Sequence, residues 1–318
     1  MVMESGESAA RVDAVCATQN GVIARWQVVE CGESAAFIRR KLRRREWATV
    51  YRGVFVDHTG PLTWRQRAWA AVVAAFPAAL SHESALHDEK VPSSGPVHIM
   101  VDRHRRVIAR PGVVVHYGSR LDERVLWHTQ PPRVRIEEAV LDVAADASSM
   151  VGVVGCLTDV LGARKTTADR LRTTLHSRRT MPRRTFIDEV LRDIRDGSCS
   201  VLEYEYLRKV ERAHALPAPR RQAPIVIGRR GLRDVEYRDW GVVVELDGRA
   251  WHDGPAARDR DLERDLDAAV GATRQTLRIG WGQVFDRPCV TARKVGEVLR
   301  AHGWDGTPVR CPACPGLP

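Results

Sequence analysis

Apolar and polar positions near the start of the chain follow the pattern of three short helices and then a pair of strands. The strand pair covers residues 50–56 and contains a tight turn at Gly53. The residues before the first helix are small and polar, so we expect residues 1–11 to be disordered. The three predicted helices cover residues 12–20, 22–30 and 35–46.

The third of these helices is strongly basic, with six basic residues and no acidic one between positions 39 and 45. A basic helix that directly precedes a β-wing is typical of a winged helix-turn-helix domain, whose last helix enters the major groove of DNA. We therefore predict such a domain over residues 12–57. A solvated helix face would have the same composition, and this alternative stays open. The candidate phosphate contacts are Arg39, Arg40, Lys41, Arg43 and Arg44.

The middle of the chain predicts an α/β extension of this domain over residues 58–150. A basic segment over residues 151–197 follows, and we interpret it as a helical linker. Between Arg164 and Arg195 it has ten basic residues against four acidic ones. The elements predicted for the extension are helices at 63–75, 78–87 and 135–145 and strands at 97–101 and 113–117.

After Ser200 the sequence changes, because carboxylates appear at strand positions, where an isolated charge is costly. We place a further domain at residues 198–304 and a tail at residues 305–318. A helix begins at Ser200, and a closing helix covers residues 291–302. The strands predicted in this domain cover residues 222–227, 232–237, 241–246 and 275–279.

The second and third of these strands predict a pair of facing carboxylates. If Asp239 and Trp240 form a two-residue hairpin loop, the numbers of paired residues add up to 479 and Asp234 lies opposite Glu245. Directly opposite side chains on one face are about 5 Å apart at Cβ, so two carboxylates there would repel each other without a cation. A hard ion such as Mg²⁺ or Mn²⁺ accepts such ligands, whereas a shift of one residue would put the two carboxylates on opposite faces.

Length and composition are those of a globular protein with two domains: 318 residues, of which 44% are hydrophobic. The longest apolar run, residues 68–80, is interrupted by Pro77 and is too short to cross a bilayer. The first residues contain neither a basic region nor an apolar one that would direct export. We therefore expect a cytoplasmic protein that does not enter a membrane.

The formal net charge is +10, and nearly all of the 50 basic residues are Arg. Arginine matches the geometry of phosphate, so nucleic acid becomes a favoured partner. The compositional bias of a GC-rich genome would produce the same excess of Arg, and charge alone does not separate the two explanations.

The seven cysteines are scattered, which argues against a disulfide framework. Cys311 and Cys314 have the spacing of a zinc knuckle. They supply two of the four ligands that a structural zinc ion needs, and the sequence has no second pair near them. We favour a frayed tail over a zinc site at this end of the chain.

The phrase Tyr51-Arg-Gly-Val-Phe55 lies directly after the third helix, and an α/β segment follows it. In these features residues 12–146 resemble AbiEi-type antitoxins of type IV toxin–antitoxin systems. The resemblance is to the family as a whole. It implies a DNA-binding protein, and it adds the operator of a toxin gene and a partner protein as candidate partners.

A second set of short motifs lies in the C-terminal half of the chain. It consists of Ser200-Val-Leu-Glu203, Leu216-Pro217 with Gln222, Arg233-Asp234, Val244-Glu-Leu-Asp-Gly248, Trp251-His252, Arg258, Asp261, Arg264 and Leu277-Arg278. In these motifs residues 198–288 resemble the very short patch repair (Vsr)-like branch of the PD-(D/E)XK nucleases. This family has a restriction-endonuclease-like αβββαβ core, so the resemblance implies a two-domain α+β and α/β protein that hydrolyses DNA phosphodiester bonds.

The resemblance also assigns roles. Asp234 and Glu245 would be ligands of Mg²⁺ or Mn²⁺, which activates the attacking water, and Glu203 would reach the ion directly or through water. The lysine that usually lies two residues after the Glu is replaced by Asp247, and His252 is the natural substitute as an acid or base. Asp247 and His252 would flank the scissile phosphate. Arg264 and Arg278 would hold phosphate oxygens, with Asp261 orienting one of them.

Simpler explanations exist for the same residues. They are a capping box of Glu203 with Ser200, an ion pair of Asp234 with Arg233 or Arg278, a turn at Asp247-Gly248, and packing of His252 beside Trp251. The sequence therefore favours a metal-dependent DNA endonuclease with an N-terminal DNA-binding domain. The alternatives are a DNA-binding regulator or antitoxin with a degenerate nuclease-like domain, and a partner-binding protein with no nucleic-acid role.

Overall fold

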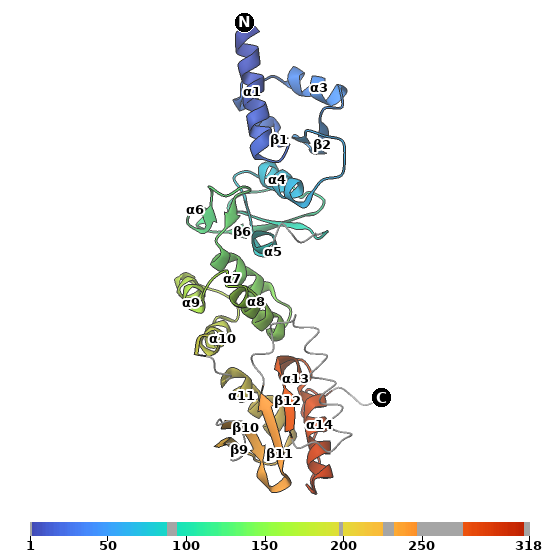
Figure 1. The fold of residues 1–318 in the computed structure, drawn as a ribbon, viewed down its shortest axis with the longest axis vertical. Coiled ribbons are helices and arrows are strands. Elements are labelled where there is room, and N and C mark those ends of the chain that lie inside the picture. Colours follow the sequence, from blue (N-terminus) through green and yellow to red (C-terminus); the bar gives the residue numbers. More distant parts are fainter. Residues whose placement is uncertain (1, 88–93, 197–199, 225–231, 247–275, 315–318) are drawn as a thin grey trace. The chain divides into compact units, whose positions relative to one another are not determined.

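The structure is a computed structural model, which describes residues 2–87, 94–196, 200–224, 232–246 and 276–314. The chain divides into two compact units, Met1–Val143 and Ala144–Pro318 (Figure 1). In the described residues, helices accompany three small sheets, so the protein is of mixed α/β type. Among these helices, none combines the length and the apolar character that a bilayer crossing requires.

The first unit begins with a small helical group on a three-stranded antiparallel sheet, in which the strands lie in the order β1-β3-β2. The Ser34 hydroxyl accepts a hydrogen bond from the Phe37 backbone N–H and caps α3. Gly53 has a φ of +80° in the turn that joins β2 to β3, as the sequence predicts. The elements are α1 (Val2–Thr18), β1 (Val22–Ala24), α2 (Arg25–Glu30), α3 (Ala35–Arg43), β2 (Ala48–Tyr51) and β3 (Val54–Val56).

Two parts of this group differ from the prediction. Helix α1 starts at Val2, so residues 2–11 are helical and not disordered. Val12 is fully buried, and the Ser8 hydroxyl donates a 2.7 Å hydrogen bond to Glu33, so packing fixes a helix that composition alone does not indicate. The predicted second helix is a strand followed by a single short helix, because residues 22–24 pair with β3.

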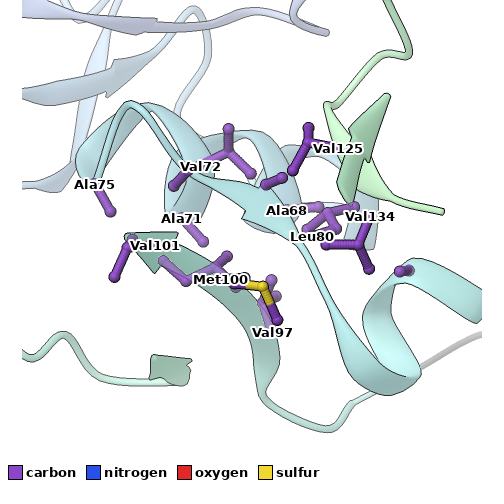
Figure 2. Close-up of a cluster of buried hydrophobic side chains, with 14 of the residues drawn as sticks. Ala68, Ala71, Val72, Ala75, Leu80, Val97, Met100, Val101, Val125 and Val134 are labelled. Atoms are coloured by element: carbon purple, nitrogen blue, oxygen red, sulfur yellow. The ribbon is translucent and has the colours of Figure 1, made fainter. Parts of the chain in front are cut away.

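The rest of the first unit is built on helix α4 (Trp64–Ala74) and a five-stranded sheet in the order β6-β5-β4-β8-β7. Figure 2 shows Ala71 and Val72 of α4 and Val97 of β5 gathered with Leu80, which is fully buried in β4. Small alanines on α4 let the helix approach the sheet closely. The other elements are β4 (Ala79–Leu80), α5 (His82–Leu86), β5 (Val97–Asp102), β6 (Val113–Gly118), α6 (Leu121–Arg124), β7 (Val125–Leu126), β8 (Arg133–Val134) and α7 (Ile136–Asp146).

The predicted helix over residues 78–87 is divided into β4 and α5. Ser81 has an extended backbone, and His82 has a φ of +48°, in the left-handed region. Leu80 and Ala79 pair with β5, so sheet formation overrides the helical pattern at this point.

The basic segment that the sequence predicts as a linker is part of the second unit. It forms α8 (Met150–Gly162), α9 (Ala168–Ser177) and α10 (Arg184–Asp196), and α8 packs against α10 and α13 (Trp281–Phe285). Its basic residues are partly used for internal ion pairs. Asp188 of α10 accepts hydrogen bonds from Arg172 (2.9 Å) and Arg192, and His176 lies 3.1 Å from it.

The ion pairs of Asp188 predict that the free energy of unfolding depends on pH. Burial raises the pKa of its carboxyl, but the hydrogen bond from Arg172 and the charges of Arg172, Arg192 and His176 lower it, and the net pKa lies below its ordinary value. The charged form therefore stabilises the fold above about pH 4, and this contribution is lost as the pH falls through the folded-state pKa. We expect Asp188→Asn to reduce the free energy of unfolding by about 3 kcal/mol at pH 7.

Denaturant unfolding at pH 7 and at pH 3 tests this expectation, with Glu189→Gln as the control on an exposed neighbour. The difference between wild type and Asp188→Asn should shrink at pH 3. An equal difference at both pH values would show that the carboxylate charge does not stabilise the fold.

The second unit continues with α11 (Ser200–Tyr206), which passes into a π-helical segment (Leu207–Glu211) and a 3-10 turn (Arg212–His214). The sheet that follows has the order β12-β11-β10-β9, in which β11 and β12 are parallel and the other neighbours antiparallel. Each of the four predicted strands has a counterpart close to its predicted position, although the predicted end of the first, residues 225–227, lies outside the described residues. The counterparts are β9 (Arg220–Pro224), β10 (Leu232–Tyr237), β11 (Val242–Leu246) and β12 (Thr276–Ile279), and α14 (Pro288–Ala301) closes the unit.

Candidate functional site

The hairpin of β10 and β11 has the register that the sequence predicts. Val235 pairs with Val244 and Tyr237 with Val242, so the numbers of paired residues add up to 479. The connection is a 3-10 turn over Arg238–Trp240, closed by Gly241 with a φ of +65°. Continuing the same register by one residue in β10 puts Asp234 opposite Glu245.

Glu245 is the exposed position of a strand that is otherwise buried. Val244 and Leu246 on either side of it are 0% and 4% exposed, whereas the Glu245 side chain is 47% exposed. Its neighbour in the parallel strand β12 is Arg278, whose Nε lies 3.7 Å from Glu245 Oε2. The structure thus brings together two of the predicted site residues, a carboxylate and a guanidinium that both remain open to solvent.

Helix α11 is attached to the opposite face of this sheet. The hydroxyls of Tyr206 and Tyr237 are 3.1 Å apart and buried, so α11 covers the face to which Tyr237 belongs. Strand side chains alternate, and Glu245 therefore belongs to the other face. Glu203 is half-buried on α11. At the start of this helix, the Val201 backbone N–H donates a 2.8 Å hydrogen bond to Asp193 Oδ2, so a residue outside the helix helps to cap it.

Four of the predicted site residues lie outside the described residues: Asp247, His252, Asp261 and Arg264. Asp234 is a residue of β10, and its position in the hairpin follows from strand register alone.

The predicted basic surface on α3 has the exposure that contact with a polyanion requires. Its four arginines are exposed on α3 and at its C-cap, whereas Phe37 and Ile38 on the opposite side are buried. Lys41 is only half-exposed and forms a 2.7 Å ion pair with Glu46. Arg44 lies 3.7 Å from the same carboxylate, and both Arg40 and Lys41 lie over the Phe37 ring. The exposed residues are Arg39, Arg40, Arg43 and Arg44.

Comparisons with known proteins add little. No family model and no curated protein matches the chain. Among solved structures, the chain is similar to the RV2827C protein from Mycobacterium tuberculosis, with 18% sequence identity over 58% of this chain and 77% of that chain, at a TM-score of 0.34. The function is therefore inferred from the residues of this chain.

In the part of the chain that the structure describes, two clusters of side chains could hold a metal ion, and sequence reasoning missed both. The first joins His82, His98 and His116 in the first unit, with His98 Nδ1 2.9 Å from His116 Nε2 and the rings of His82 and His116 stacked at 3.5 Å. His82 Nδ1 also lies 3.1 Å from Ser81 Oγ, and His98 Nδ1 lies 3.6 Å from Glu83 Oε2. Because the imidazoles contact one another and neighbouring polar groups, we interpret this cluster as a packed polar group.

The second cluster lies in the second unit and joins His214, Cys289, Cys311 and Cys314, whose ligand atoms all lie within 4.8 Å of one another. It corrects the expectation of a frayed tail at Cys311 and Cys314. Seventy-five residues separate His214 from Cys289, so no local spacing in the sequence could have indicated the full set.

Proposed function

We propose that the chain is a metal-dependent DNA endonuclease of the cytoplasm, with a winged helix-turn-helix region in its first unit and a Vsr-like PD-(D/E)XK core in its second. The observation that carries the proposal is the 479 register of Val235–Tyr237 with Val242–Val244, whose continuation by one residue would put Asp234 opposite Glu245. A pair of carboxylates at that separation is stable at neutral pH when a cation lies between them.

The donor set fits Mg²⁺ or Mn²⁺, which prefer carboxylate oxygens. Asp234 and Glu245 would hold the ion, and the exposed fraction of Glu245 leaves it accessible from solvent. When bound, such an ion lowers the pKa of a coordinated water and stabilises negative charge on phosphate. Arg278, at 3.7 Å from Glu245, would turn from this carboxylate to a phosphate oxygen when DNA and metal are present. Glu203 is given no role in holding the ion, because α11 covers the opposite face of the sheet from Glu245.

The basic α3 surface supports DNA as the partner. Four exposed arginines on one short helix can contact several phosphates, and the two buried residues Phe37 and Ile38 hold that helix to its own core. The first unit would therefore supply affinity for the duplex, and the second unit would supply the chemistry.

Cleavage of plasmid and duplex oligonucleotides by the full-length protein tests the proposal. The buffer should be free of Mg²⁺ and Mn²⁺ but should contain no strong chelator, so that any thiolate-bound metal is retained. We expect nicking or linearisation when Mg²⁺ or Mn²⁺ is added. Intact substrates under all these conditions, together with no heat of Mn²⁺ binding by calorimetry, would refute the proposal.

One observation favours a second function, that of a DNA-binding regulator or AbiEi-type antitoxin. Arg278 already pairs with Glu245, and such an ion pair can stabilise a sheet without any metal. This function would require the α3 surface and an operator or partner protein. The wild-type protein would then cleave no DNA, and Asp234→Ala or Glu245→Ala would leave DNA binding unchanged.

A further inference from the structure

A four-residue cluster in the second unit has the composition of a structural zinc site. His214 comes from the 3-10 turn after the π-helical segment, Cys289 from the first turn of α14, and Cys311 and Cys314 from the segment after α14. Three cysteines and one histidine are among the common ligand sets of structural Zn²⁺, which is four-coordinate and tetrahedral.

The distances between the ligand atoms are those of the edges of a zinc tetrahedron. A tetrahedron with Zn–S bonds of about 2.3 Å has S···S edges of about 3.8 Å, and one Zn–N bond of about 2.0–2.1 Å gives S···N edges of about 3.5 Å. Cys289 Sγ lies 3.6 Å from Cys311 Sγ, Cys311 Sγ lies 3.8 Å from Cys314 Sγ, and Cys314 Sγ lies 3.7 Å from His214 Nε2. A disulfide would need two sulfurs about 2.05 Å apart, and the structure has these cysteines as free thiols.

The histidine is oriented as a metal ligand. Its Nδ1 lies 3.1 Å from the carbonyl oxygen of Val210, which can only accept, so Nδ1 carries the proton. The lone pair is then on Nε2, the atom that faces Cys314 Sγ. A histidine ligand in proteins commonly donates its other N–H to a carbonyl in this way. The imidazole is almost fully buried, with 2% of the residue exposed.

The tail that carries two of the thiols is packed against the unit. The Val309 N–H donates a 2.8 Å hydrogen bond to the carbonyl oxygen of His214. Pro308 lies so close to Gly296 of α14 that a Cβ atom added there would be 2.2 Å from Pro308 Cγ. A glycine at this position of the helix lets the tail approach, and the approach brings Cys311 and Cys314 to Cys289.

We propose that His214, Cys289, Cys311 and Cys314 bind one structural Zn²⁺ ion. The ion links the end of the helix that begins with α11 to the start of α14 and to the tail, and it closes a loop that contains the whole β9–β12 sheet. Its binding releases the thiol protons to solvent, and no redox step is involved. This site has soft thiolate ligands and lies apart from the proposed carboxylate site for a hard ion, so the failure of either proposal leaves the other standing.

Metal analysis of the full-length protein tests the proposal. The chain is purified without chelator from cells grown with added zinc, and its zinc content is measured by plasma mass spectrometry. We expect about one Zn²⁺ per chain. Removal with a strong chelator should lower the Tm by more than about 5 °C, and should make three further thiols reactive toward a thiol reagent. Addition of Co²⁺ to the stripped protein should give the visible absorption of tetrahedral cobalt thiolate.

Matched variants separate the four ligands from other thiols. Cys289→Ser and the double variant Cys311→Ser/Cys314→Ser should lose most of the zinc, whereas Cys156→Ser, which changes a cysteine outside the cluster, should retain it. His214→Cys keeps a complete ligand set and should retain zinc, whereas His214→Ala should not. If the variants fail to fold, the wild-type zinc content and thiol count still decide. Zinc-free wild type, a disulfide among these cysteines, iron in place of zinc, or equal zinc loss in Cys156→Ser would overturn the proposal.

Discussion

Glu245→Gln and Asp234→Asn are each expected to reduce Mg²⁺-dependent DNA cleavage by roughly 100-fold or more. Each change removes one negative charge from the pair of carboxylates that the 479 register puts opposite each other, while the side chain keeps its size. The bound ion would activate the attacking water and stabilise negative charge on the phosphate, so weaker binding of the ion lowers the cleavage rate directly. Initial rates of plasmid nicking, at several Mg²⁺ concentrations, measure the effect.

Asp239→Asn is the matched control, because it neutralises an exposed carboxylate in the turn of the same hairpin. It should cleave DNA at the wild-type rate. If all three variants lose activity together, the hairpin has been destabilised and the loss says nothing about metal. If Glu245→Gln and Asp234→Asn cleave at the wild-type rate, the paired carboxylates are not the catalytic site.

The double variant Arg39→Ala/Arg43→Ala is expected to weaken binding to duplex DNA roughly tenfold or more at moderate salt. The two arginines lie four residues apart on the exposed face of α3, so one phosphate backbone can contact both. Each lost phosphate contact should lower the slope of log affinity against log salt by about 0.9, and the double variant should lower it by about 2. Fluorescence anisotropy with a labelled duplex at four or more salt concentrations measures both quantities.

Arg11→Ala/Arg120→Ala removes the same charge from exposed positions outside α3 and serves as the control. Arg11 lies 3.4 Å from Glu7 and Arg120 lies 3.3 Å from Glu123, so both are engaged on the surface of the same unit. An unchanged salt slope in the α3 variant, or an equal change in the control, would show that overall charge and not the α3 surface binds DNA.

The sequence predicted the sheet of the second unit well. The apolar runs of its strands mark their positions, and the register of β10 with β11 is the predicted one, although the connection is a 3-10 turn over Arg238–Trp240 and not a two-residue loop. The strand pair around Gly53 and the helix before it were predicted correctly, because glycine is the residue that most readily adopts the positive φ of a tight turn. Strand β1 was missed, since it forms only by pairing with β3.

The parts that could not be predicted depend on contacts between distant residues. The start of α1 at Val2 is stabilised by Ser8 and Glu33, which are 25 residues apart. The cluster of His214 with three cysteines is assembled by the packing of the tail on Gly296, and the spacing of Cys311 and Cys314 in the sequence indicates only two of its four ligands. Asp188 likewise forms ion pairs with Arg172 and Arg192, two residues of the segment that the sequence predicts as a basic linker.

A crystal structure of the protein soaked in Mn²⁺ would decide whether the paired carboxylates form a metal site, since manganese can be located by its anomalous scattering and distinguished from zinc at the thiolate cluster. We expect a manganese peak between the carboxylates of Asp234 and Glu245, with Arg278 turned away from its 3.7 Å contact with Glu245. A structure in which Arg278 still pairs with Glu245, with no peak between the two carboxylates at saturating Mn²⁺, would contradict the proposed endonuclease site.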